Sequence, residues 1–404
     1  MTRAPDGPAL PPTVSVGFLL IFPVRLATTN ATPAFDVEAM PAQDAAAHDA
    51  AFALAEEHLL GRPFREGGRI RRRLIGRLAL SDSGPGAPAW ADMTLITHSA
   101  GVGLWEAWLP APPQPLDASR WLAWLDADNP ESLVTRLWPV LAAAGQPLGA
   151  EPLWPRLYFP HVILRARDTP LETLLEQQGE AMVRLLFLDR SRLPLKPAVV
   201  DATLAEDHCA RQGGLTLLGR RAALDVLAAG RDADYPEQPR LPPQPALPFI
   251  VTLETLLLER AALDGLYARL ARAAPQSVEG LLALKREVLG ALEEYYGANF
   301  TGSRFTDSVT IAGEVLLGIT DLVDALMARL DAVGFEITTR YQNRMTRLQF
   351  WLTIVFGATE IGFIASGIAT WHYRTELGAV LAWTIGAAVA SGLLLALVLR
   401  RWIR

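Results

Sequence analysis

The sequence ends in two long apolar runs, residues 350–371 and 377–399, which only five residues separate. Each run is close to the 20 residues that a helix needs to cross the hydrocarbon core of a bilayer. The mean hydropathy of the chain is +0.20, and these runs account for most of it. We therefore expect two transmembrane helices that form a C-terminal hairpin, which excludes a fully soluble protein.

Arginines flank the predicted spans and indicate their orientation. The loop His372–Glu376 between the spans holds only one Arg and one Glu, so the positive-inside rule places both ends of the hairpin in the cytoplasm. An early apolar run, Ser15–Val24, contains a proline and lacks a small-residue cleavage pattern, which predicts a buried strand and no signal peptide. We expect a multi-pass protein of the bacterial cytoplasmic (inner) membrane with both termini in the cytoplasm. The flanking arginines are Arg340, Arg344 and Arg347 before the first span, and Arg400, Arg401 and Arg404 after the second.

Composition excludes several other classes of protein. The single cysteine, Cys209, excludes a disulfide scaffold and a cysteine-built metal site. A net charge of −6 gives no basic footprint, so no nucleic-acid partner is expected. The six histidines are scattered, and neither a two-histidine metal helix nor a nucleophile elbow occurs. We therefore expect no enzymatic activity and no tightly bound cofactor.

Residues 1–245 are predicted to form a cytoplasmic α/β domain. A helical stretch is expected at Ala45–Leu60. The Arg-rich segment Arg69–Arg77 indicates a solvated face or a subunit contact, with an anion site as the alternative. Six prolines among residues 235–248 predict a linker or a stiff extended crossing at the domain boundary. The expected strands are Val14–Leu26, Met93–Thr97, Gly103–Leu109, Leu157–Arg165 and Val183–Leu188.

Residues 246–347 are predicted to form a helical stalk domain. One helix is expected over residues 249–273, and a second from Ser277 to about Gly297. A third opens at Ser303 and continues without a break to Trp371, since no proline follows Pro275. Its seam alternates spacings of three and four, which favours packing against the preceding helices, self-association around an axis, or both. The seam residues are Val309, Ala312, Leu316, Ile319, Val323, Leu326, Leu330, Val333 and Ile337.

Residues 348–404 are the predicted transmembrane hairpin and basic tail, and its two spans differ in chemistry. The second span is mostly Gly, Ala, Leu and Val, and Gly378, Gly386 and Gly392 would allow close backbone approach. The first span contains Glu360, which is costly in a bilayer unless it faces water, a cation or a partner. A structural, hydrogen-bonded Glu360 is the alternative to a pore-lining one. One polar, aromatic and small face is expected to line a pore: Thr346, Gln349, Thr353, Phe356, Glu360, Phe363, Gly367 and Thr370.

This layout resembles the CorA superfamily of divalent-cation channels. The segments Gln342-Asn343-Arg344, Leu352-Thr353-Ile354 and Ile364-Ala365-Ser366-Gly367-Ile368 are similar to the stretch where that family's long helix enters the membrane. Leu399-Arg400-Arg401-Trp402 resembles its basic tail. The resemblance implies a homopentamer whose first spans line a pore for Mg²⁺ or a related divalent cation. It also implies an inner basic ring of Arg400, Arg401 and Arg404.

The outer end of the first span departs from the family. Where the family has Gly-Met-Asn, which forms its selectivity ring, this chain has Thr370-Trp371-His372. The expected outer entrance is therefore Trp371, His372 and Glu376. Glu360 falls where the family has an apolar constriction, and five carboxylates there would form a cation site.

Two other functions stay open at this point. One is a membrane effector or sensor pore of the CorA type, gated by a small signalling molecule, as in defence-associated members. The other is a non-conducting, membrane-anchored scaffold. The sequence shows no phosphate-binding loop of the usual spacing that would favour a nucleotide ligand.

Overall fold

The computed structural model describes residues 13–29, 33, 38, 40–60, 70–80, 86–153, 158–165, 169–191, 193–209, 212–227, 241–272, 279–280, 282–283, 286, 304–372 and 376–402. The chain divides into two compact units. The first unit comprises residues 1–273 and 284–327, and the second comprises residues 274–283 and 328–404. Each unit is described by itself.

The first unit is built on one mixed sheet with the strand order β2-β3-β4-β1-β6-β8-β7, and a short β5 pairs with β1 off this path. All neighbouring strands are antiparallel except β6 and β8. The long β1 lies between β4 and β6, so the apolar run near the N-terminus becomes a central strand. The strands are β1 Thr13–Arg25, β2 Ile70–Ala79, β3 Trp90–His98, β4 Val102–Pro115, β5 Glu151–Pro152, β6 Phe159–Arg165, β7 Leu215–Leu218 and β8 Ala223–Leu227.

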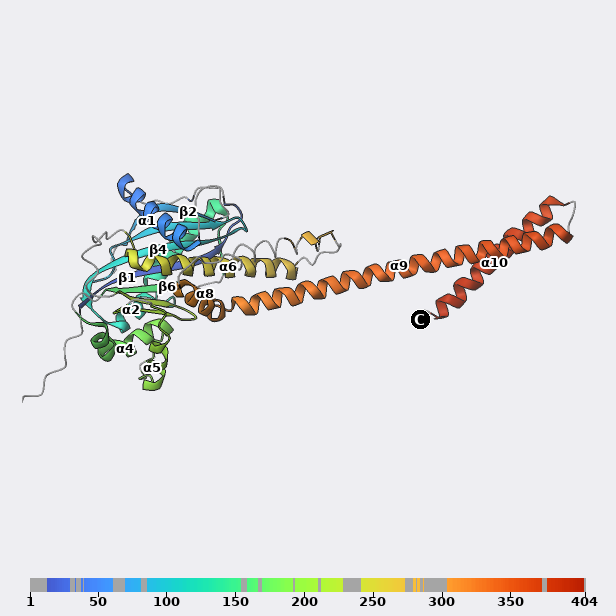
Figure 1. The fold of residues 1–404 in the computed structure, drawn as a ribbon. Coiled ribbons are helices and arrows are strands. Elements are labelled where there is room, and N and C mark those ends of the chain that lie inside the picture. The colour runs from blue at the N-terminus through green and yellow to red at the C-terminus, as the bar shows by residue number, and fades with distance from the viewer. Residues whose placement is uncertain are drawn as a thin grey trace, which may run out of the picture. The chain divides into compact units, whose positions relative to one another are not determined.

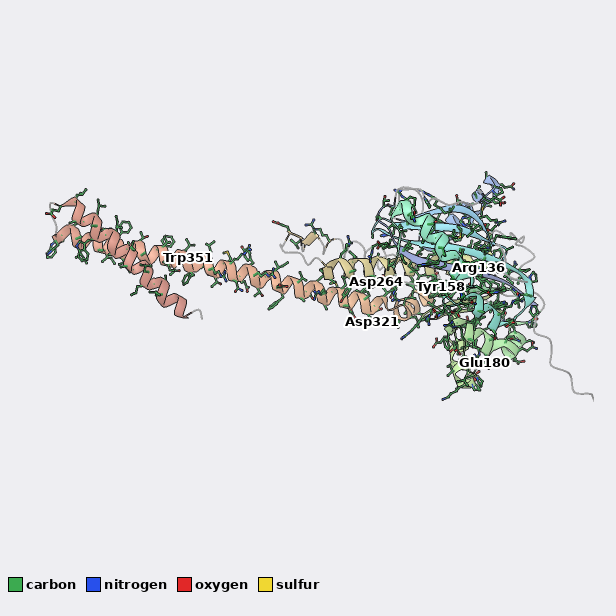
Figure 2. The ribbon with its side chains drawn as sticks, turned by 180° about the vertical axis from the view of Figure 1, so that it is seen from behind. Arg136, Tyr158, Glu180, Asp264, Asp321 and Trp351 are labelled. Carbon is green, nitrogen blue, oxygen red and sulfur yellow. The ribbon has the colours of Figure 1, made fainter. Side chains whose placement is uncertain are left out.

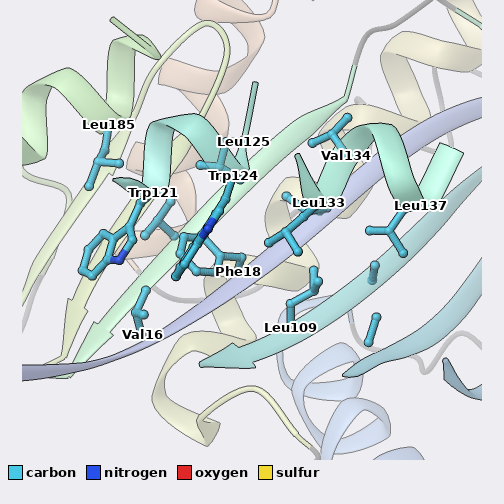
Figure 3. Packing of buried hydrophobic residues seen from close by; sticks show 14 of the residues in the cluster. Val16, Phe18, Leu109, Trp121, Trp124, Leu125, Leu133, Val134, Leu137 and Leu185 are labelled. Atoms are coloured by element: carbon cyan, nitrogen blue, oxygen red, sulfur yellow. The ribbon is translucent and has the colours of Figure 1, made fainter. Parts of the chain in front are cut away.

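One face of the sheet is apolar and is covered by α2 (Ala118–Trp124), α3 (Leu133–Gly145) and α4 (Leu171–Phe187). Alternate residues of β1 point to this face, as the period of two in a strand requires. Phe18, for example, packs edge-on against Trp121 and Trp124, with ring centroids 6.0 and 5.9 Å away. Figure 3 shows this core, with α2 and α3 lying over the strands. A further helix, α5 (Pro197–Ala205), packs on α4.

The opposite face of the sheet is covered by α1 (Ala42–Leu60), α6 (Leu247–Arg272) and α8 (Arg304–Leu316). In Figure 1, α1 and α6 lie on one side of the strands, and α2, α4 and α5 on the other. This second face holds buried polar and charged residues from five strands. They are Arg72, Thr94, Glu106, His161 and Asp225.

Arg72 of β2 lies at the centre of a buried ionic cluster on this face. Its Nε is 2.8 Å from Glu56 of α1, and its Nη1 is 3.2 Å from Glu106 of β4 and 3.1 Å from Glu254 of α6. Its second Nη atom also donates to Glu254, and the guanidinium lies 4.0 Å from the ring centroid of Phe52. The expectation of a solvated face or subunit contact at Arg69–Arg77 is therefore wrong for Arg72, because its charge is neutralised inside the unit.

The three carboxyl groups exceed the single positive charge of Arg72. Burial and the neighbouring Glu254 raise the pKa of Glu106 well above its usual range, although Arg72 acts in the other direction. This environment favours retention of a proton among the three carboxyl groups, and such a proton reduces their mutual repulsion.

The long helix predicted from Ser303 is divided into two helices in the structure. A turn at Leu317 and Gly318, with Gly318 at φ +68°, separates α8 from α9 (Ile319–His372). The expected unbroken helix from Ser303 to Trp371 is therefore wrong at this point, because a left-handed residue cannot continue an α-helix. The seam faces inward within the single chain: Val309, Ile319, Leu326, Leu330, Val333 and Ile337 are buried, and Ala312, Leu316 and Val323 are half-buried.

Other sequence expectations have mixed outcomes. The strands at Val14–Leu26, Met93–Thr97, Gly103–Leu109 and Leu157–Arg165 are confirmed within one to several residues at their ends. The strand at Val183–Leu188 is wrong, because these residues form the apolar end of α4. The helix over 249–273 is confirmed as α6. Most of the Pro-rich segment and of the helix expected from Ser277 to Gly297 lies outside the described residues.

Removing the charge of Arg72 should destabilise the first unit more than any surface change. Arg72→Met leaves three buried carboxyl groups without their cation, a loss of about 3–5 kcal/mol. We expect the apparent Tm of the detergent-solubilised chain, followed by Trp fluorescence, to fall by about 10 °C. Arg73→Met, the next residue along β2, is the matched control and should change Tm by much less. Equal losses in the two variants would show that the cluster is not a principal support.

Candidate functional site

Two helices at the end of the chain are long and apolar enough to cross a membrane. An 18-residue window of α9 has a mean hydropathy of 1.7, and a window of α10 (Leu377–Trp402) reaches 2.1. These windows match the two apolar runs of the sequence. Figure 2 shows Trp351 where α9 enters its apolar part, and its side chain is exposed.

Small residues bring α9 and α10 together as an antiparallel hairpin. A Cβ placed on Gly362 would lie 3.1 Å from the Cβ of Ala388, and one on Gly392 would lie 3.4 Å from the Cβ of Ala358. Such contacts allow close backbone approach, the usual way in which helices associate in lipid. The expected close approach is thus confirmed for Gly392. At Gly378 and Gly386 a Cβ would meet nothing within 4 Å among the described atoms of the single chain, so close approach there stays a prediction.

The predicted pore-lining face lies on the side of α9 away from α10. At 100° per residue, Glu360 and Gly362 point in nearly opposite directions. Leu352 and Ile368 lie between these two sides and are exposed and apolar. α9 therefore has a side that packs on α10, exposed apolar flanks and an exposed polar stripe. We call this last face the exposed stripe: Thr346, Gln349, Thr353, Phe356, Glu360, Phe363, Gly367 and Thr370, all of them exposed.

The threonine hydroxyls of the exposed stripe are held by the helix itself. Thr346 donates to the carbonyl of Gln342 at 2.9 Å, Thr353 to that of Gln349 at 2.9 Å, and Thr370 to that of Ser366 at 2.7 Å. Each hydroxyl proton is thereby occupied, so each oxygen presents only lone pairs outward. The stripe therefore offers acceptor oxygens, together with the Glu360 carboxyl group, to whatever lies beside it. This property follows from the i−4 spacing and was not part of the sequence prediction.

Glu360 is exposed in the single chain and forms no ion pair with any residue that the structure describes. It lies in the middle of the apolar part of α9, two turns or more from either end. In a bilayer, a carboxyl group at this depth must face water, a cation or another protein surface. None of the described residues pairs with the Glu360 carboxyl group, so in a bilayer its partner would have to be water, a cation or another chain.

The expected outer entrance lies at the junction of the two helices. Trp371 and His372 end α9 and are exposed, and Glu376 precedes α10. The Glu376 carbonyl accepts from Ala379 and Val380 at 3.1 and 3.3 Å, so this residue opens the helix. A carboxylate at a helix N-terminus is favourably placed relative to the helix dipole. Residues 373–375 lie outside the described residues.

The basic residues at the inner ends are only partly described. Arg340 forms an exposed i,i+4 ion pair with Glu336 on α9. The backbones of Arg400 and Arg401 belong to α10, but their side chains and all of Arg404 lie outside the described residues. The inner basic ring therefore stays a prediction.

The first unit contains His208 and Cys209, which are adjacent in the sequence. The Nδ1 of His208 is 2.8 Å from the Oγ of Ser308 on α8, so the histidine is part of a helix contact. Across the described residues, no group of three or more His, Cys, Asp or Glu side chains is arranged to hold a metal ion. A cation site on the exposed stripe would need several copies of Glu360.

Compared with protein-family models, curated proteins and solved structures, the chain has no match.

The packing of the hairpin can be tested with one disulfide. In a Cys209→Ser background, Ala358→Cys combined with Gly392→Cys should form a bond within one chain, because the Cβ separation of 3.4 Å is close to that of disulfides. Intact-mass measurement should show the loss of two hydrogens. Ala358→Cys combined with Gly386→Cys is the control and should stay reduced. A bond in the control alone would contradict the packing described.

Proposed function

We propose that this chain is a subunit of a homopentameric, CorA-like membrane channel that passes Mg²⁺ or a related divalent cation down its electrochemical gradient. Its two apolar helices would cross the bacterial cytoplasmic membrane, with both termini in the cytoplasm and the exposed stripe facing a central axis. One observation supports this function above all. The polar stripe with Glu360 lies on the side of α9 that α10 leaves uncovered.

The position of the stripe relative to α10 favours assembly around water. A structural Glu360 could have been satisfied within the hairpin, but the described residues of α9 with close contacts to α10 include only small ones, Gly357, Ala358 and Gly362. Several copies around an axis would bring their stripes together and remove each carboxyl group from lipid. The apolar flanks and α10 would then face lipid and neighbouring subunits.

The chemistry of the stripe suits a hydrated cation. Mg²⁺ dehydrates reluctantly and is commonly held through its waters, whose hydrogens point outward. The lone pairs of Thr346, Thr353 and Thr370 can accept those hydrogens. A ring of Glu360 carboxylates would add the negative charge that concentrates cations at mid-membrane. These groups would take over the selectivity role of the absent Gly-Met-Asn motif.

Exposed apolar residues before the apolar part of α9 also favour self-association. Phe335 is 76% exposed on α9, and Ile311 and Val315 are exposed on α8. The seam residues are already buried within the single chain. Ile311, Val315 and Phe335 lie on other faces of α8 and α9 and remain exposed. Large exposed apolar groups of this kind commonly mark protein–protein contacts.

The oligomeric state provides the first test. Native mass spectrometry of the detergent-solubilised chain should give five copies. Phe335→Glu should shift the population toward smaller species, because it places a charge on an exposed apolar contact surface. A purely monomeric wild-type chain in both detergent and lipid nanodiscs would contradict the proposal.

Cation flux into proteoliposomes with a trapped Mg²⁺-sensitive dye provides the second test. We expect Glu360→Gln to lower the Mg²⁺ flux at least tenfold, which corresponds to about 1.4 kcal/mol, because it removes one carboxylate per subunit from the pore. Glu376→Gln, the matched change at the exposed helix junction, should lower it less than threefold.

Other outcomes favour the other functions. A wild-type chain that passes no divalent cation, with or without Glu360, would overturn the channel. Flux that begins only after cytoplasmic extract is added would favour an effector pore gated by a small molecule. A pentamer that excludes all ions and water would favour a membrane-anchored scaffold.

A further inference from the structure

The helices α6 and α8 lie side by side and run in the same direction. Phe249 of α6 meets Phe305 of α8 with ring centroids 6.3 Å apart, Leu256 contacts Gly313, and Arg260 donates to the carbonyl of Leu317. Each successive contact is further along both helices. α8 is thus held along its whole length against the helix that covers the polar face of the sheet.

A buried carboxyl group of α6, with one oxygen that has no hydrogen-bond partner among the described residues, lies beside α8. Glu259 of α6 is 3% exposed, and its Oε1 has no hydrogen-bond partner. Glu314 of α8, four residues before the turn at Gly318, is the one described residue whose charge acts on it. Burial, followed by repulsion from Glu314, raises the pKa of Glu259 to about 8. Burial also raises the pKa of Glu314.

Several other charged groups on α6 and on the elements packed against it have partners of their own. On α6 itself, the neighbouring Arg260 donates to Leu317. Glu56 of α1 and Glu106 of β4 belong to the Arg72 cluster, which meets α6 at Glu254, more than one turn before Glu259. The Nε2 of His161 on β6 lies 3.3 Å from Oδ2 of Asp225, and its ring packs against Phe249, near the start of α6. The described stretch of β1 that faces α6 is apolar, with Leu19 and Ile21.

The interface ends at the turn that leads into α9. Leu317 donates to the Gly313 carbonyl at 2.8 Å, and Gly318 donates to that of Val315 at 3.1 Å. A Cβ on Gly318 would meet nothing within 4 Å, so this left-handed residue is held by the chain on either side and not by packing. The position of α8 on α6 therefore sets where α9 begins.

We propose that protons on Glu259 and Glu314 control the α6–α8 interface: α8 packs against α6 while the buried Glu259 is neutral, and ionisation of Glu259 beside Glu314 releases α8 at the Gly318 turn. At neutral pH the pair keeps a proton. As the pH rises through about 8, Glu259 becomes a buried carboxylate that faces a second one, and the contact weakens. Its contribution to folding is complete below the ordinary pKa of a glutamate and is lost as the pH rises through the raised value.

Hydrogen exchange of the full chain in detergent tests the contact directly. Between pH 6.5 and 9, wild-type amides of residues 304–316 should lose at least tenfold in protection relative to Glu259→Gln at the same pH, which also cancels the intrinsic rate. Glu314→Gln removes the repulsion that helps to raise the pKa of Glu259, so its loss of protection should be smaller and should level off at a lower pH. Asp307→Asn, an exposed carboxyl change on α8, should match the wild type.

Equal protection of the wild type and Glu259→Gln at every pH would overturn the inference. If Glu259→Gln does not fold, the comparison of Glu314→Gln with the wild type decides in its place: superimposable pH profiles reject the contact, and a displaced profile supports it.

The effect on conduction rests on the proposed function and is measured separately. Wild-type flux in proteoliposomes should change at least threefold between pH 7 and 9, and Glu259→Gln should remove that change. A pH-dependent α8 without any cation flux would reject the channel and leave the contact standing. Flux that responds to pH equally in both chains, with equal exchange, would reject the contact and leave the channel standing.

Discussion

The guanidinium of Arg72 is the interaction on which the first unit depends. It joins a strand at the edge of the sheet to β4 and to two helices, through carboxyl groups that are 16, 34 and 182 residues away in the sequence. Taking these charges out of water is costly, and only their mutual contacts offset that cost. α6 therefore has one register on the sheet in which Glu254 meets its cation. The helices that follow are positioned from that register.

The two faces of the sheet differ in chemistry. The face under α2, α3 and α4 is a packed apolar core. The face under α1, α6 and α8 holds most of the buried ionisable groups, including the Arg72 cluster and the His161–Asp225 pair. α8, which covers the face with the buried ionisable groups, leads through Gly318 directly into α9. A charge change there can alter packing without disturbing the core.

Features that depend on neighbouring residues could be predicted from the sequence. The apolar runs, the central strand at Val14–Leu26 and the stripe around Glu360 follow from local hydrophobicity and from periods of 2 and 3.6 residues. Features that depend on a distant partner, or on the backbone conformation of a single residue, could not. No residue near Arg72 in the sequence indicates that Glu254 is its partner. The seam keeps its spacing of three and four across Gly318, so the spacing does not reveal that the helix ends there. Val183–Leu188 was mistaken for a strand because a short apolar run at a helix end has no period of its own. The partner of Gly362 could be recognised only once α10 was folded back against α9.

The close approach of Gly362 to Ala388 has a mechanical consequence. Helices that touch through Gly and Ala backbones interlock, and neither can turn about its own axis without expelling the other from its groove. Turning α9 by a single residue would rotate it by about 100° and would drive larger side chains into the space that Ala388 now occupies. The contact therefore opposes rotation of α9 about its own axis. In the proposed channel, the pore diameter would then change through tilting of each α9–α10 pair as a unit, and not through rotation of α9 alone.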